Sequence, residues 1–127
     1  MNRFLIVFLG GGLGSACRHG VNLISAQFPG SRYPIGTFCV NVFGSLLIGV
    51  FAEWFALRSQ LASNVRLFLI TGILGGFTTF SAFSLEIGLL HERGETMAAA
   101  AYAVVSVASG VAALFCGMYL VRSLTPA

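Results

Sequence analysis

The stretch Gly75-Gly76-Phe77-Thr78-Thr79-Phe80-Ser81-Ala82-Phe83-Ser84-Leu85-Glu86 occupies the middle and second half of a long apolar segment, residues 66–90. Two adjacent glycines followed by two β-branched threonines make a poor helix centre, because each glycine costs about 1 kcal/mol and β-branching lowers helix propensity further. In a bilayer, irregular backbone persists only where it is buried in protein or lines a cavity. The stretch predicts either a helix broken near its middle or a continuous helix whose glycines lie at a crossing.

The rest of the chain has the composition of a membrane protein. Of 127 residues, 57% are hydrophobic and 9% are charged, whereas an ordinary globular domain carries about 25% charged residues. A spanning helix needs roughly 20 mostly apolar residues, so four helices with short connections use nearly the whole length. We therefore expect an all-α membrane protein with a single transmembrane domain over residues 1–127 and helices at about 4–28, 35–57, 66–90 and 97–121.

The charges are few and dispersed. A net charge of +3 without clustered basic residues excludes nucleic-acid binding. Four passes place the N-terminus, the second connection and the C-terminus on one side, with four arginines against two or three on the other. Orientation in the membrane follows the Lys/Arg content of short loops, so this small difference in arginine number specifies the orientation only weakly. The chain is therefore expected to insert both ways up, and a homodimer of inverted copies would supply the two inverted halves that transporters often need.

Small residues four positions apart recur in all four segments. Such pairs let helix backbones approach closely where lipid gives no hydrophobic drive. They indicate either packing within one bundle or a subunit interface. The pairs are Gly10 with Gly14, Ser45 with Gly49, Gly72 with Gly76, and Ser106 with Gly110.

Beyond the paired glycines, aromatic rings and hydroxyl groups lie side by side. Residues three apart share a helix face, so Phe77, Phe80 and Phe83 form one stripe. A second stripe of hydroxyl residues adjoins it. Because the edge of an aromatic ring is positive and hydroxyls donate hydrogen bonds, the two stripes together suit a small anion. The alternative is that these phenylalanines face lipid or fill the core.

Two other segments carry matching polar lines. Thr37, Asn41 and Ser45 fall at i, i+4 and i+8 on one, and Tyr102, Ser106 and Ser109 fall at i, i+4 and i+7 on the other. Scattered hydroxyls can bond back to their own helix, but an asparagine near mid-membrane needs a partner. The three faces together favour a hydrated or ion-bearing track.

Arg18 and Glu86 are the ionisable groups within the apolar segments, and such groups are functional hypotheses by default. Glu86 is close enough to its helix end for the carboxylate to reach the interface instead. Arg18 is about ten residues from its helix end, roughly 15 Å at helical rise, and so is expected to face a water-filled vestibule.

Across its whole length the chain resembles the Fluc (CrcB) fluoride channels. The resemblance rests on Gly11-Gly12-x-Gly14-x-x-x-Arg18, on Gly36-Thr37-Phe38-Cys39-Val40-Asn41 and above all on Gly75-Gly76-Phe77-Thr78-Thr79-Phe80-Ser81. It implies an antiparallel, dual-topology homodimer with two narrow fluoride pathways, each built from both subunits. Such a channel exports fluoride passively across the bacterial cytoplasmic (inner) membrane and lowers its toxicity.

The resemblance also assigns roles. Phe80 and Phe83 correspond to an aromatic box whose edges meet fluoride, with Asn41 across from it. The resemblance implies that the third helix is broken near its middle and that its carbonyls, from both subunits, hold a structural sodium ion at the dimer centre; Gly75 and Thr78 correspond to these residues. The remaining polar track and its vestibule cation would be Ser81, Thr37, Tyr102, Ser106, Ser109, Glu86 and Arg18. Ala82 and Gly110 stand where some relatives carry hydroxyls.

Two rival functions remain at this stage. A small proton-coupled exporter of cationic drugs would centre on a deep carboxylate in the first helix, where this chain has Arg18. A non-transporting membrane anchor or assembly protein would use its small residues for packing alone and would tolerate Phe80→Ile. The sequence contains no nucleophile, acid–base pair or metal cluster arranged for catalysis, so no enzyme is expected.

Overall fold

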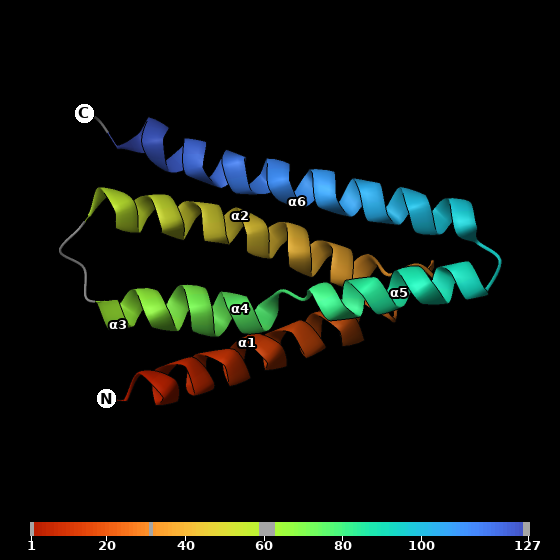
Figure 1. Cartoon of the computed structure of the whole chain (residues 1–127), viewed down its shortest axis with the longest axis horizontal. Coiled ribbons are helices and arrows are strands. Elements are labelled where there is room, and N and C mark those ends of the chain that lie inside the picture. Colours follow the sequence, from red (N-terminus) through yellow and green to blue (C-terminus); the bar gives the residue numbers. More distant parts are fainter. Residues whose placement is uncertain (1, 31, 59–62, 126–127) are drawn as a thin grey trace.

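The computed structural model describes residues 2–30, 32–58 and 63–125. It contains four helices that are long and apolar enough to cross a membrane, which confirms the four expected spans (Figure 1). The first is α1 (Arg3–Ser25), the second is α2 (Ile35–Leu57) and the fourth is α6 (Thr96–Leu124). The third span consists of α3 (Ser63–Arg66), the π-helical η1 (Leu67–Leu74), α4 (Gly75–Phe77) and α5 (Phe80–Glu92).

Two helix ends differ from the expected positions. α1 ends at Ser25 rather than near residue 28, and turns continue to Gly30, whose φ of 96° suits glycine. α6 continues to Leu124 rather than ending near residue 121, because its last turn remains helical up to the extended residue Thr125.

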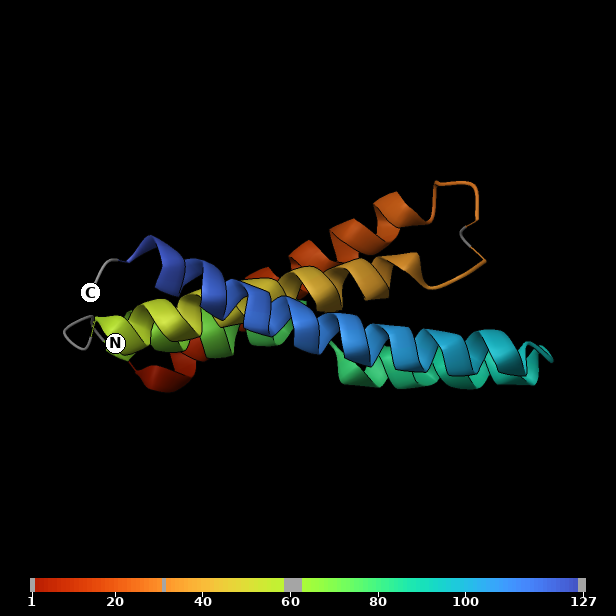
Figure 2. The ribbon, with the colours of Figure 1, turned by 90° about the horizontal axis from the view of Figure 1, so that it is seen from above.

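The helices lie roughly along one axis, with the start of α1 and the end of α6 at the same end of the bundle (Figure 1). α2 packs along α6, whereas α1 packs against η1 and α4. At the end away from the termini, α5 pairs with the first half of α6, and the hairpin of α1 and α2 diverges from this pair (Figure 2).

Glycines bring the backbones together at the crossing of α1 with the third span. A Cβ atom on Gly14 would collide with the carbonyl oxygen of Ile73, and one on Gly76 would collide with the backbone of Gly11. Gly49 is equally close to the backbone of α6. These small residues therefore serve packing within the chain, one of the two alternatives left open by their spacing.

The third span is interrupted near its middle, as expected, and the two threonines that follow the glycines form the break. Thr78 (φ −79°, ψ 156°) and Thr79 (φ −153°, ψ 123°) are extended, while Gly75 and Gly76 remain helical in α4. Gly76 is needed for the close approach to α1, because a side chain here would collide with the backbone of Gly11, whereas a Cβ atom on Gly75 would meet only Ile70 of its own span. The break falls on Thr78 and Thr79, whose β-branched side chains favour extended backbone.

Candidate functional site

Asn41 of α2 satisfies the backbone at the break. The N–H of Thr79 donates to Asn41 Oδ1 at 2.8 Å, and Asn41 Nδ2 donates to the Thr79 carbonyl at 3.0 Å. One side-chain amide thus supplies both a donor and an acceptor to an extended residue inside a span, where unpaired backbone groups are costly. This is the partner that an asparagine at this depth needs.

Thr79 also begins the helix that follows the break. Its Oγ1 accepts a hydrogen bond from the N–H of Ala82 at 3.2 Å, the geometry of a helix N-cap, and the residue is buried. Thr79 was not among the site residues expected from the sequence. The available signal was a threonine directly before a helix that resumes at Phe80, which is a preferred N-cap residue.

The hydrogen bonds that the N–H groups of Thr79 and Ala82 donate to side chains leave two carbonyl oxygens without their helical donors. In a continuous α-helix the Gly75 carbonyl would accept from the N–H of Thr79, and the Thr78 carbonyl would accept from the N–H of Ala82. Both donors are instead taken by side chains, Asn41 and Thr79 respectively. Gly75 and Thr78, the two residues predicted to hold sodium, therefore lack these helical partners at their carbonyls.

A groove of about 520 Å³ runs beside the break, between α2 and α6. Six of the predicted site residues line it together: Asn41, Gly75, Thr78, Phe80, Phe83 and Ser106. Most of the remaining lining is aliphatic, so the few polar groups lie in an apolar wall. Such a groove, with a small number of placed polar groups, is the usual form of a ligand site.

The two predicted aromatic residues lie in contact but in different environments. The rings of Phe80 and Phe83 have centroids 5.6 Å apart at 47°. Phe83 is buried, at 7% exposure, and also contacts the ring of Tyr102 at 5.3 Å, whereas Phe80 is 77% exposed on the single chain. Phe80 therefore projects from the groove into the space outside the chain.

Ser106 places a hydroxyl group in the same groove from α6. Its Oγ is buried and has no hydrogen-bond partner among the described residues. A buried hydroxyl without a partner is unusual in native structures and calls for an occupant that it can bond. The groove is thus lined by a buried hydroxyl group that can donate a hydrogen bond.

Glu86 is held inside the bundle rather than reaching for the interface. The hydroxyl of Thr37 donates to Glu86 Oε1 at 2.6 Å, and the hydroxyl of Tyr102 donates to Oε2 at 2.8 Å. A polar pocket of about 250 Å³ adjoins Thr37 and Glu86 at the end of the bundle. Because Tyr102 also packs on Phe83, this hydrogen-bonded trio continues from the aromatic pair toward that pocket.

The structure does not bring the remaining predicted residues into this arrangement. Arg18 lies on α1, with Nη2 3.5 Å from Ser15 Oγ, and Ser15 in turn donates to the Gly76 carbonyl. Ser81 is exposed, with its Oγ 3.3 Å from Thr79 Oγ1. Ser109 is half-buried on α6, outside the groove lining. The roles of these three residues stay predictions.

Four spans, one of them broken beside a groove with polar groups, are features of multi-pass channels and transporters. The chain belongs to the CrcB-like protein family: the model described as "CrcB-like protein, Camphor Resistance (CrcB)" matches residues 5–118. The family resemblance inferred from the sequence is therefore confirmed.

Bacterial relatives match almost the full length. A protein of Nitrobacter hamburgensis named fluoride-specific ion channel FluC 2 is 53% identical over 96% of this chain and 98% of the relative. Proteins named fluoride-specific ion channel FluC from Rhodopseudomonas palustris (52% identical over 96% of this chain and 98% of the relative) and Granulibacter bethesdensis (53% identical over 98% of both) are similar as well.

Proposed function

We propose that this chain is a fluoride-selective ion channel of the bacterial inner membrane, through which fluoride leaves the cell passively. The observation that carries the proposal is the groove, which is lined by both the ring of Phe83 and the buried hydroxyl of Ser106. The names of relatives that match nearly the whole chain support the same function. The protein is a channel and not an enzyme.

The chemistry of the groove suits fluoride. Fluoride is small and strongly hydrated, so a pathway must replace its water with several weak donors rather than one strong trap. Phe80 and Phe83 offer positive ring edges, and Ser106 offers a hydroxyl donor. None of the residues that line the groove carries a formal positive charge, so the anion is not held too tightly to leave.

The working unit is an antiparallel homodimer of oppositely inserted copies, with two pathways that each draw residues from both subunits. Support comes from the open groove and from Phe80, which is 77% exposed on one chain although it lies at mid-span. A second copy would cover this ring and complete the wall of the groove. The weak arginine bias of the connections permits both orientations.

A structural sodium ion at the dimer centre fits the residues at the break. Oxygen ligands suit hard cations such as sodium, and backbone carbonyls of unwound helices are common donors for it. The carbonyls of Gly75 and Thr78 have lost their helical partners and both residues line the groove. One copy supplies two such oxygens, and an inverted partner would supply two more.

The two rival functions have less support. A proton-coupled drug exporter needs a carboxylate deep in the first span, and residues 3–25 contain no Asp or Glu. A packing-only anchor would have no use for an unpartnered hydroxyl in an aromatic groove.

Fluoride efflux from liposomes that contain the purified chain tests the proposal. When an ionophore lets potassium leave with the anion, a fluoride electrode should record rapid release of fluoride. A chloride electrode in the matching experiment should record no release of chloride. Release no faster than from empty liposomes would rule out the channel. Covalently tethered antiparallel dimers should conduct, and conduction by parallel fusions alone would rule out the inverted arrangement.

A further inference from the structure

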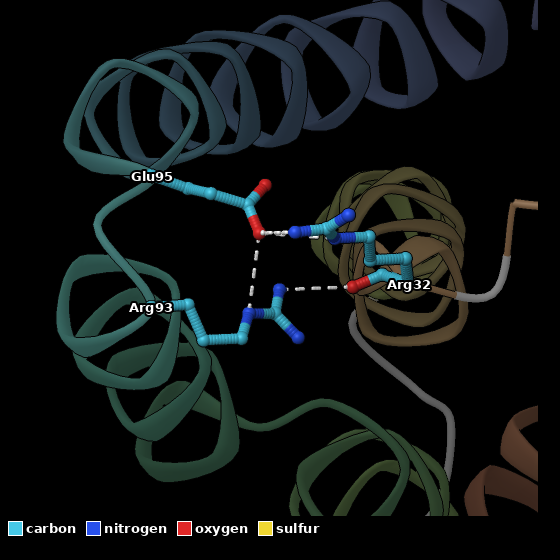
Figure 3. Close-up of polar contacts among 3 residues, drawn as sticks. All are labelled: Arg32, Arg93 and Glu95. Carbon is cyan, nitrogen blue, oxygen red and sulfur yellow. Dashed lines mark hydrogen bonds and ion pairs between the residues drawn. The ribbon is translucent and has the colours of Figure 1, made fainter.

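Three charged residues join the two connections at the end of the bundle away from the termini (Figure 3). Arg32, between α1 and α2, donates from Nε (3.0 Å) and Nη2 (2.8 Å) to Glu95 Oε1, between α5 and α6. Arg93 lies 3.4 Å from the same oxygen and donates from Nη2 to the carbonyl of Arg32 at 3.1 Å. We call these three residues the clasp.

Each member of the clasp adjoins one helix that carries a member of the Glu86 trio. Arg32 precedes α2, which carries Thr37, and Glu95 directly precedes α6, which carries Tyr102. Arg93 directly follows α5, which carries Glu86 itself. The offsets are five to seven residues, so the clasp lies about 10 Å along the same three helices from the trio.

The clasp spans the place where the bundle is least tied together. At this end the hairpin of α1 and α2 diverges from the pair of α5 and α6 (Figure 2). Among the described residues, the hydrogen bonds that link the two hairpins beyond the break are those of the clasp and the one from Thr37 to Glu86. At this end these few polar contacts supplement the packing of α2 on α6 in holding α2 near α5.

We propose that the clasp is a positioning device for the ion pathway: it holds α2 against α5 and α6, so that Thr37 and Tyr102 both bond Glu86. The clasp residues do not contact the ion. This inference rests on the proposed channel function for its flux readout. Its structural readout is independent of that function.

A second arginine–glutamate pair provides a matched control. Arg122 donates from Nε to Glu53 Oε1 at 2.8 Å and from Nη2 to Oε2 at 2.9 Å. This pair also links α2 to α6, but at the opposite end of both helices, far from Glu86. Breaking it weakens the packing of α2 on α6 without releasing Thr37.

The first experiment compares fluoride efflux of Glu95→Gln, Arg32→Gln and the control Glu53→Gln/Arg122→Gln with that of the unchanged chain. An exposed ion-pair network biases a two-state equilibrium by a factor of roughly two to five, so the clasp variants should lose about that much flux. The control should retain its flux. Equal loss in the control, or no loss in the clasp variants, would overturn the proposal.

A double-mutant cycle tests whether the clasp acts through Thr37. Thr37→Val keeps the shape of the side chain and removes its hydrogen bond to Glu86. If the clasp positions Thr37, adding Glu95→Gln to Thr37→Val should lower flux no further. Effects that multiply would mean that the clasp acts elsewhere and would refute the positioning role.

A distance measurement separates failure of this inference from failure of the channel function. Ile35 on α2 and Leu89 on α5 are 44% and 49% exposed, so Ile35→Cys and Leu89→Cys can carry spin labels in a background without the native cysteines. Glu95→Gln should broaden and lengthen the distance distribution, and the charge swap Arg32→Glu/Glu95→Arg should restore it. An unchanged distribution would overturn the clasp whether or not the chain conducts fluoride.

Discussion

The two halves of the third span, residues 63–77 and 80–92, lie in one membrane-crossing segment but are built on different principles. The first half packs on α1 through backbone contacts at glycines, as at Gly14 and Gly76. The second half packs on α6 through an aromatic contact between Phe83 and Tyr102, and α2 and α6 both donate hydrogen bonds to its Glu86. The break at Thr78 and Thr79 is the boundary between a half that fixes the structure and a half that faces the groove.

This division suggests that substitutions in the two halves fail differently. Changes on the glycine side should remove folded protein, whereas changes on the polar side should remove transport from folded protein. Substitutions on either side of the break test this difference, and they differ in the size of the loss that we expect.

Gly14→Val should cause the largest loss. The new side chain would meet the carbonyl oxygen of Ile73, a backbone atom that cannot move aside, and overpacking of this kind costs about 1–3 kcal/mol or more. Size-exclusion chromatography in detergent should show little monodisperse protein. Gly12→Ala on the same helix meets nothing within 4 Å and should behave as the unchanged chain. Normal yield and flux for Gly14→Val would contradict the packing role.

Asn41 lies at the boundary between the halves, so its loss should affect both stability and transport. Asn41→Leu leaves the N–H and the carbonyl of Thr79 without partners, and each buried unsatisfied group costs about 1–3 kcal/mol. Asn41→Asp keeps an acceptor for the N–H, and its carboxyl group can donate to the Thr79 carbonyl only when it is protonated. In detergent, the melting temperature should be highest for the unchanged chain, intermediate for Asn41→Asp and lowest for Asn41→Leu. Equal melting of all three would mean that the amide does not hold the break.

Variants of the aromatic pair Phe80 and Phe83 should lose transport and largely keep the fold. Phe80→Ile and Phe83→Ile each remove a ring edge, an aromatic contact of about 0.5–1.5 kcal/mol, so flux should fall about two- to tenfold. Phe80 is exposed on the single chain, and its replacement should leave monomer stability unchanged. Phe83 is buried and its variant should also melt slightly earlier. Unchanged liposome efflux in both variants would remove the rings from the pathway.

The smallest effect should be that of pH on the clasp. Burial raises the pKa of Glu95, but the hydrogen bond and charge of Arg32, a hydrogen bond from Tyr33 and the charge of Arg93 together outweigh it and hold that pKa below the ordinary 4.5. A carboxyl whose pKa is lowered by folding stabilises the fold above its ordinary pKa, and this contribution disappears as the pH falls through the lowered value. The label distance between residues 35 and 89 should therefore stay constant near neutral pH and broaden only below 4.5.

Glu95→Gln provides the control for this titration, because it removes Glu95 and leaves the neighbouring His91 and Glu92 in place. The variant should show no further broadening in acid. A transition near neutral pH in the unchanged chain would mean that a group other than Glu95 controls the label distance.

Much of the fold could be predicted from composition and spacing. Four apolar stretches of sufficient length predicted four membrane spans. The adjacent glycines and threonines identified the part of the third span with the lowest helix propensity. The position of the break within that stretch could not be predicted. It depends on which residues meet the backbone of α1, and Gly76 meets Gly11 only once the chain has folded.

The site could be predicted in part for the same reason. Helical spacing grouped Asn41, Ser106 and Phe83 on faces that the structure does bring together in the groove. Spacing could not show that Asn41 would bond the backbone of Thr79, 38 residues further along, or that Arg32 would pair with Glu95 across 63 positions. Arg18 contacts Ser15 on its own helix and is not among the residues that line the groove, so its vestibule role stays a prediction.

The amide bridge between Asn41 and Thr79 also has a consequence for biogenesis. A span that contains two extended residues would carry bare peptide groups into lipid if it were inserted alone, at several kcal/mol for each group. The ribosome, however, releases Asn41 well before Thr79, so α2 can already be in the bilayer when the third span leaves the translocon. Because α2 is synthesised first, its Asn41 can satisfy the backbone of the third span as that span enters the bilayer. Exchanging the two spans in a permuted gene should therefore impair membrane insertion, even though every contact of the final bundle is retained.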